Sequence, residues 1–215
     1  MTLHHLEPLR QPAVRPAGQG RPRDTSIDAR ATEAVLELLE SAPYSSLTME
    51  AVAAKADTSK PALRRRWKSL PGVVVHTLIE ALGPAETPDT GCVHCDLVIG
   101  ASEVADTFSF SSVTHALPGL LSDLASDPEL RELFIREYFD SRRDATRAVF
   151  ENAISRGEIH EGIDMELTLD LVAAPLYYRA FFGHQPITRE VAERSVLSVL
   201  NGIATNVWKA HHQAG

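Results

Sequence analysis

Residues 47–69 of the chain read LTMEAVAAKADTSKPALRRRWKS. Thr48 is a good helix N-cap and predicts a short helix directly after it. Asp57 predicts a turn, because Asp and Asn are the non-glycine residues that best tolerate a left-handed backbone. Ser59 predicts the cap of a second helix, with Pro61 in its first turn, where proline is tolerated. The segment therefore predicts two short helices joined by a tight turn, a helix-turn-helix.

The second of these helices is expected to present a basic outer face. From Lys55 to Lys68 the chain holds six basic residues and one acidic residue, a charge of +5 in 14 residues. Leu63 and Trp67 stand at i and i+4 and predict the buried face, so Lys60 and Arg64 should point outward. A basic run is often only a solvated helix face. On a helix-turn-helix it favours the major groove of DNA, where arginine donates to O6 and N7 of guanine.

The net charge of the whole chain conceals two parts of opposite sign. The 215 residues sum to −8, yet residues 1–82 hold 11 Lys/Arg and 9 Asp/Glu, whereas residues 83–215 hold 10 and 20. The acidic part should face away from DNA phosphates, as a sensor and dimerisation domain would. The sequence has no apolar run of the roughly 18 residues that cross a membrane, no signal-peptide pattern and only two cysteines. We therefore expect a cytoplasmic protein.

Helical periodicity continues along the chain, and no strand pattern competes with it. We expect an all-α protein of about nine helices, divided at the Gly- and Pro-rich segment GPAETPDTG. Two long helices are expected in the second part, one over residues 127–156 and one from Thr188 to about Lys209. The expected divisions are a flexible arm (residues 1–24), a three-helix DNA-binding domain with the helix-turn-helix (25–82), a linker (83–91) and a larger helical ligand-binding and dimerisation domain (92–215).

The segment from Leu47 to Ser69 resembles the DNA-binding domain of the tetracycline-repressor (TetR) family. The C-terminal half also resembles a ligand-binding domain of that family, through residues 88–91, 156–158, 164–170 and 175–179. The resemblance implies a homodimeric transcriptional regulator, most often a repressor, whose partner is a near-palindromic double-stranded DNA operator. It also implies that a small effector binds the protein and lowers its affinity for DNA.

The resemblance implies more DNA contacts than the periodicity supports, which are Lys60, Arg64 and one or two neighbours. The sequence departs from the family pattern at three positions. Asp57 stands where glycine is usual, Arg64 where tyrosine is usual, and Leu70 where lysine is usual. These departures bear on the individual contacts and on the operator sequence. The DNA contacts that the resemblance implies are Thr48, Thr58, Ser59, Lys60, Ala62, Arg64, Arg66 and Lys68.

The resemblance also implies an effector pocket in the larger domain and a dimer interface on the helices expected over about residues 165–183 and 188–209. Aromatic residues at helical spacing can also be plain core, so both interpretations stay open for each residue. We expect a small, mostly apolar or aromatic effector, with His115 and Arg142 as candidate polar contacts. The expected pocket residues are Phe108, Phe110, His115, Leu121, Phe134, Tyr138, Tyr177, Tyr178 and Phe181. The expected interface residues are Leu171, Ala192, Val196, Val199, Leu200, Ile203 and Val207.

Cys92 and Cys95 form a C-x-x-C pair. A structural zinc site needs four ligands and usually two such pairs, so we expect no metal. A redox-responsive regulator that uses this pair is one alternative. The sequence contains no G-x-S-x-G, no phosphate-binding glycine loop and no H-E-x-x-H, so we expect neither an enzyme nor a cofactor. Another alternative, which Asp57 and Leu70 would allow, is a helical small-molecule-binding protein with weakened DNA binding.

Overall fold

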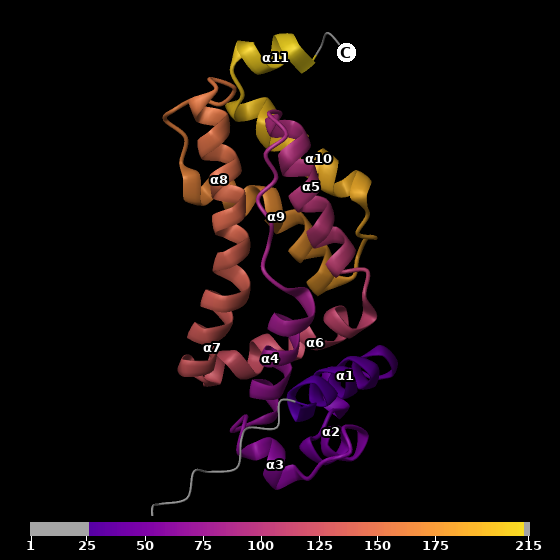
Figure 1. The fold of residues 1–215 in the computed structure, drawn as a ribbon. Helices are drawn as coiled ribbons and strands as arrows, with labels where there is room; N and C mark the ends of the chain where they lie inside the picture. The colour runs from indigo at the N-terminus through magenta and orange to yellow at the C-terminus, as the bar shows by residue number, and fades with distance from the viewer. Residues whose placement is uncertain (1–25, 213–215) are drawn as a thin grey trace, which may run out of the picture.

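The computed structural model describes residues 26–212, and all their named elements are helices (Figure 1). The all-α prediction is confirmed over this range, and the expected arm over residues 1–24 lies outside it. None of the described helices is long and apolar enough to cross a membrane. The helices at the lower end in Figure 1 are α1 (Ser26–Ser41), α2 (Met49–Lys55), α3 (Lys60–Arg64) and α4 (Leu70–Leu82), with a 3₁₀ turn at Tyr44–Ser46.

The N-terminal helices form as their local signals predict. Thr48 Oγ1 accepts from the amide of Ala51 at 3.1 Å, which caps α2. Ser59 Oγ accepts from the amide of Ala62 at 3.3 Å, which caps α3. Asp57 has a φ of 47°, so the turn between α2 and α3 adopts the left-handed conformation without a glycine. The helix-turn-helix therefore forms although glycine is replaced at the turn.

The rest of the described chain builds a taller helical body above these four helices (Figure 1). Helix α6 lies across the top of α1 and α4, while α5 packs along α10 and also touches α8 and α9. Residues 83–92 connect the two parts without regular structure. The helices of the body are α5 (Val93–Thr107), α6 (Ser111–Ser126), α7 (Pro128–Phe134), α8 (Ser141–Ser155), α9 (Met165–Phe182), α10 (Arg189–Ile203) and α11 (Asn206–His212).

The helix expected over residues 127–156 is interrupted by one wider turn. Residues Ile135–Asp140 form a π-helix between α7 and α8, with Tyr138 buried. A π-turn inserts an extra residue into the α-helical repeat and therefore rotates the side chains that follow it. The periodicity of the sequence does not report this insertion. The π-turn brings Tyr138 and Phe139 to the wall of the cavity described below.

The helix expected over residues 188–209 ends at Ile203, and α11 begins only at Asn206. Ala204 between them is extended and forms an isolated antiparallel bridge with Ile159. The Thr205 amide donates to the Glu158 carbonyl at 2.9 Å. The loop after α8 thus holds the end of α10 by backbone pairing, which two helical stripes alone cannot predict.

The largest contact between the DNA-binding part and the helical body is made by α6. Tyr44 Oη donates to Asp123 Oδ2 at 2.6 Å. His115 Nδ1 lies 2.7 Å from the carbonyl oxygen of Leu39, the last buried residue of α1. Gly119 faces the Tyr44 ring so closely that a Cβ there would lie 2.5 Å from Cδ1. The two parts are therefore joined by a fitted contact as well as by the connecting segment.

Candidate DNA interface and ligand pocket

The helix-turn-helix lies at the lower end of the molecule in Figure 1. A short basic ridge is formed by four of its wholly or partly exposed side chains, Lys60, Arg64, Arg65 and Lys68. Leu63 and Trp67 are buried against the domain core, as their spacing predicts. Arg64 at the end of α3 is consequently exposed, and Lys60 at its start is partly exposed. Thr48 and Ser59 are exposed at the two helix caps, and Thr58 lies partly exposed in the turn.

Two of the expected DNA contacts point elsewhere. Ala62 is buried, with 7% of its surface exposed, so its methyl group packs inward. Arg66 Nε lies 2.6 Å from Asp28 Oδ1, and only 12% of the Arg66 side chain is exposed. Helix α3 ends at Arg64, so residues after it do not continue the helical register on which the expectation depended. Arg66 therefore holds the recognition segment to α1.

The remaining lysines of the ridge have acidic neighbours. Lys60 pairs with Glu50 of α2, and this contact lowers the pKa of Glu50. Lys68 Nζ lies 3.5 Å from Glu129 Oε2 of α7, with both side chains almost fully exposed. Such exposed pairs are weak in water, so nucleic-acid phosphates can compete for both lysines. Arg65, which is exposed beside Arg64, is a further cation of this ridge.

A cavity of about 710 Å³ lies in the helical body among α5, α8, α9 and the π-turn. Five of the nine expected pocket residues line it, and they are Leu121, Phe134, Tyr138, Tyr177 and Phe181. Much of the remaining wall is aliphatic or small and comes from α5, α8 and α9, including Leu97, Val104, Ala145, Val149, Leu169 and Val172. Such residues give no signal in the sequence because they also fill ordinary helical cores.

The other four expected residues lie outside the cavity wall. Phe108 is buried behind it, with its ring edge-on to Tyr177 at a centroid distance of 4.9 Å. Phe110 is 60% exposed, and Tyr178 is 57% exposed on the outer face of α9. His115 lies at the contact between α6 and α1. A helical period locates an apolar stripe but does not tell which neighbour covers it.

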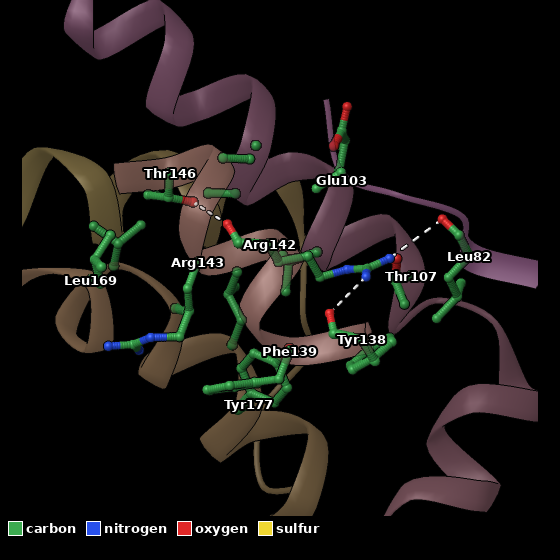
Figure 2. A pocket seen from close by; sticks show the side chains of 18 of the residues that line it. Leu82, Glu103, Thr107, Tyr138, Phe139, Arg142, Arg143, Thr146, Leu169 and Tyr177 are labelled. Carbon is green, nitrogen blue, oxygen red and sulfur yellow. Dashed lines mark hydrogen bonds between the residues drawn. The ribbon is translucent and has the colours of Figure 1, made fainter. Parts of the chain in front are cut away.

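Arg142 reaches across the cavity wall toward Leu82 at the end of α4 (Figure 2). Arg142 Nη1 donates to the Tyr138 carbonyl at 2.9 Å, and Nη2 lies 3.3 Å from the carbonyls of Leu82 and Gly83. The Arg142 guanidinium also lies over the Tyr138 ring, 4.3 Å from its centroid. Burial raises the pKa of both Tyr138 and Tyr177, so both phenols stay protonated and can donate a hydrogen bond.

The expected dimer interface divides between core and surface. Ala192, Val196 and Leu200 are fully buried within the chain, because α10 turns this stripe toward α5. In this fold these three side chains belong to the core of one chain and present no surface to a partner. Val199 and Ile203 are partly buried at the edge of that core. Leu171 and Val207 are about half exposed.

The outer face of α9 carries an exposed apolar stripe instead. Leu167, Leu171, Tyr178 and Phe182 are between 50% and 69% exposed. Their spacing of four, seven and four residues places them on one side of the helix. The rings of Tyr178 and Phe182 lie 4.8 Å apart. Exposed apolar side chains gathered on one face are typical of a protein–protein contact.

Cys92 and Cys95 lie together at the start of α5. Cys92 Sγ accepts from the Cys95 amide at 3.3 Å as the helix N-cap, and the two sulfur atoms are 2.7 Å apart. The hydrogen bond between the two thiols raises the pKa of Cys95 to about 11. Among the described residues, no group of three or more His, Cys, Asp or Glu side chains is arranged to hold a metal ion.

A helix-turn-helix joined to a helical body with an apolar cavity defines the class of one-component transcriptional regulators, in which one polypeptide carries both the DNA-binding and the sensor domain. The model of the tetracyclin repressor-like C-terminal domain matches residues 87–199, more than half of the chain. An HTH-type transcriptional regulator of Bacillus subtilis, YdeS, is 25% identical over 86% of this chain and 93% of its own length. The chain therefore belongs to the TetR family of DNA-binding transcriptional regulators.

Solved structures share the fold. A TetR transcriptional regulator from Agrobacterium tumefaciens matches with a TM-score of 0.68 and 17% identity, over 88% of this chain and 99% of its own. The regulator FadR from Bacillus subtilis, solved in complex with stearoyl-CoA, matches with a TM-score of 0.65 and 14% identity, over 81% and 98%. At these identities the structures bear on the fold alone.

Proposed function

We propose that the protein is an effector-responsive repressor that binds a near-palindromic operator as a homodimer. The observation that carries this proposal is a direct link between cavity and DNA-binding part. Arg142 stands in the cavity wall and holds the last carbonyls of α4, the helix that follows the recognition segment. A molecule that occupies this end of the cavity can therefore shift α4. The resulting change in DNA affinity cannot exceed the effector's differential affinity for the two states.

The proposed DNA interface is the ridge of the helix-turn-helix. Lys60, Arg64 and Arg65 would face the major groove, while the cap at Thr48 and the turn at Thr58 would meet the phosphate backbone. Phosphates would then take Lys60 from Glu50, since an exposed pair of this kind is weak. The proposal keeps Ser59 and Lys68 as contacts and assigns Arg66 and Ala62 to the support of α3.

The proposed dimer places the outer face of α9 against its own twofold copy. The exposed stripe of Leu167, Leu171, Tyr178 and Phe182 would then pack against the same stripe of the second copy, as a twofold interface requires. On α10, Leu197 is partly exposed and Asn201 is exposed, so both could extend the proposed interface. A twofold axis here would give two recognition helices for two half-sites, and one short helix such as α3 reads too few base pairs alone.

The proposed effector is a small, mostly apolar molecule. The cavity volume of about 710 Å³ is in the range of drug-sized ligand sites. Related FadR was solved with stearoyl-CoA, and by analogy we propose that this cavity also takes a ligand. The polar groups of the cavity suit ligand binding rather than catalysis, so the proposal includes no reaction. A regulator that acts on DNA would work in the cytoplasm, so the proposal includes this location.

DNA binding is tested by selecting operators from a random pool with the full-length protein. The selected DNA is then titrated with Lys60→Ala plus Arg64→Ala, with Arg136→Ala on the π-turn as the control that removes an exposed cation elsewhere. We expect the double variant to lose at least about tenfold in affinity and to lower the salt slope by about 2. Wild-type affinity and slope in the double variant would overturn the proposed ridge. Failure to select any DNA would favour the alternative of a binding protein with weakened DNA binding.

The sulfur distance of 2.7 Å favours one alternative mode of control, through oxidation of Cys92 and Cys95 to a disulfide. In that mode hydrogen peroxide would take two electrons and the two thiol protons from the pair, so the disulfide forms as the O–O bond breaks and two molecules of water leave. We expect Cys92→Ser plus Cys95→Ser to respond to the effector as the wild type does. If peroxide releases the wild type from DNA but does not release this variant, the protein is instead redox-responsive.

A further inference from the structure

Arg142 is a cation whose hydrogen-bond partners are neutral. Its three contacts are all backbone carbonyls, those of Tyr138, Leu82 and Gly83. The neighbouring residue shows the contrast, because Arg143 pairs with the carboxylates of Glu166 and Asp170. The two side chains point to opposite sides in Figure 2. Arg142 thus supplies a positive charge that no carboxylate of the described residues pairs with.

The acidic residues of the cavity wall are engaged elsewhere or exposed. Asp96 accepts from both the amide and the hydroxyl of Thr90, at 2.8 and 2.7 Å. Asp170 belongs to the pair with Arg143. Glu86 and Glu103 are exposed to solvent. The inner wall near Arg142 is therefore positive at one point and apolar or aromatic around it, with the Tyr138 and Tyr177 side chains beside it.

We infer that the effector carries one carboxylate on an apolar body, and that this carboxylate takes the Arg142 guanidinium away from Leu82 and Gly83. The inference rests on the proposed function and names the ligand class for the same cavity. A carboxylate accepts two parallel bonds from guanidinium and binds it more strongly than neutral carbonyls do. The two carbonyls of α4 lie at 3.3 Å, at the long end of hydrogen-bond distances, so they are the partners most easily replaced.

The same exchange explains how occupancy would reach the DNA-binding part. Leu82 is the last residue of α4, and Gly83 caps it with a φ of 60° and its amide on the Ile79 carbonyl at 3.1 Å. When Arg142 turns to the carboxylate, the final carbonyls of α4 lose their donor from α8. This end of α4 would then be held only by its own helix and by apolar contact. The effector head group therefore acts on α4 through one side chain.

The first test compares matched probes that differ only in the head group. Decanoate is paired with 1-decanol and 4-phenylbutyrate with 4-phenyl-1-butanol, and each is titrated against the full-length protein by displacement of a fluorescent anilinonaphthalene sulfonate. We expect each carboxylate to bind at least about tenfold more tightly than its alcohol. Arg142→Met should remove this difference. Arg143→Met is the control, since it removes a cation of the same wall that already has carboxylate partners, and it should keep the difference.

The second test separates the attraction of the Arg142 charge for a carboxylate from the effect of the bound carboxylate on the end of α4. Hydrogen exchange is followed at the amides of residues 79–83 and of Ala85, with and without decanoate. In the wild type we expect decanoate to speed exchange there at least about fivefold, because α4 loses two contacts. Arg142→Met should exchange fast from the start and should not change with decanoate. Arg142→Lys keeps the charge without the planar fork, so it should retain part of the carboxylate preference and lose the exchange response.

The outcomes distinguish this inference from the proposed function. Alcohols that bind as tightly as the carboxylates and release the selected operator equally well would overturn the carboxylate assignment and leave an effector-responsive repressor. A carboxylate preference that persists in Arg142→Met would overturn the role of Arg142. If none of the four probes enters the cavity or changes operator binding, the effector-responsive function and this inference fall together.

Discussion

Gly119 gives the sharpest test of the contact between the two parts of the molecule. A Cβ at this position would lie 2.5 Å from Cδ1 and 3.1 Å from Cγ of the Tyr44 ring. Tyr44 is buried and its hydroxyl is held by Asp123 at 2.6 Å, so the ring cannot turn aside freely. We therefore expect Gly119→Ala to destabilise the protein, although alanine is the better helix former.

The magnitude follows from three contributions. Overpacking of this kind costs about 1–3 kcal/mol, and a hydrogen bond to a charged acceptor that is lost when the ring moves costs about 1.5–3 kcal/mol. Replacement of a glycine inside a helix by alanine returns about 1 kcal/mol. The expected net loss is about 3 kcal/mol in the free energy of unfolding, measured by urea denaturation of the full-length protein.

Two further variants make the result decisive. Gly100→Ala in α5 is the matched control, since its new Cβ would meet nothing within 4 Å, and we expect it to stabilise by about 1 kcal/mol. In a Tyr44→Ala background the ring that obstructs Gly119→Ala is gone and only the Cβ of residue 44 remains, at 3.3 Å, so the same substitution should cost far less. A loss of similar size in both backgrounds would refute the packing explanation. A gain in the wild-type background would refute the geometry of the contact.

Three other predictions concern the ion pairs and the α9 surface. Arg66→Met should lower the free energy of unfolding by about 1–3 kcal/mol, because it leaves the partly buried Asp28 carboxylate without this partner. Arg64→Ala should change the free energy of unfolding by less than about 0.5 kcal/mol and weaken DNA binding. An equal loss of stability in both variants would contradict the separate roles of the two arginines. Arg143 and Arg147 lower the pKa of Glu166 below its ordinary value of 4.5. Their contact with the ionised carboxylate therefore adds to the free energy of unfolding above that value, and this stabilisation disappears as pH falls through the lowered pKa. When the urea midpoint is measured as a function of pH, Glu166→Gln should accordingly reduce its fall at acidic pH. An unchanged fall would show that the contact is absent in solution. Leu171→Glu should give monomers in sedimentation velocity while Ile99→Glu, on another exposed apolar side chain, should not; a dimer that survives Leu171→Glu would exclude the α9 face.

The parts of the fold that the sequence predicts are those set by local chemistry. Thr48 and Ser59 cap helices with their own side chains, and Asp57 tolerates a left-handed turn by itself. These signals need no knowledge of distant residues. They are sufficient to place the caps and the turn of the helix-turn-helix, whereas α3 ends at Arg64, before the Trp67 that the expected helix included.

The parts that were missed depend on which neighbour covers each helix face. Val196 and Leu200 form a stripe that suits a partner chain as well as it suits α5, and only the fold decides for α5. Tyr177 and Tyr178 are adjacent in sequence, yet one lines the cavity and the other lies half exposed outside. The π-turn before α8 is equally invisible, because an inserted residue leaves the composition of the helix unchanged.

The links between the helical body and the DNA-binding part differ in kind, and this difference gives the motion a direction. The contacts of α6 with α1 and Tyr44 lie outside the cavity wall, and they are short hydrogen bonds beside a close-packed glycine. The link from Arg142 to the end of α4 lies in the cavity wall and consists of two long bonds to neutral carbonyls. Occupancy of the cavity can break only the second link. The α6 contact should then serve as the fixed point about which the end of α4 moves, so Gly119→Ala should impair folding and operator binding without the effector, whereas Arg142→Met should impair the response to it.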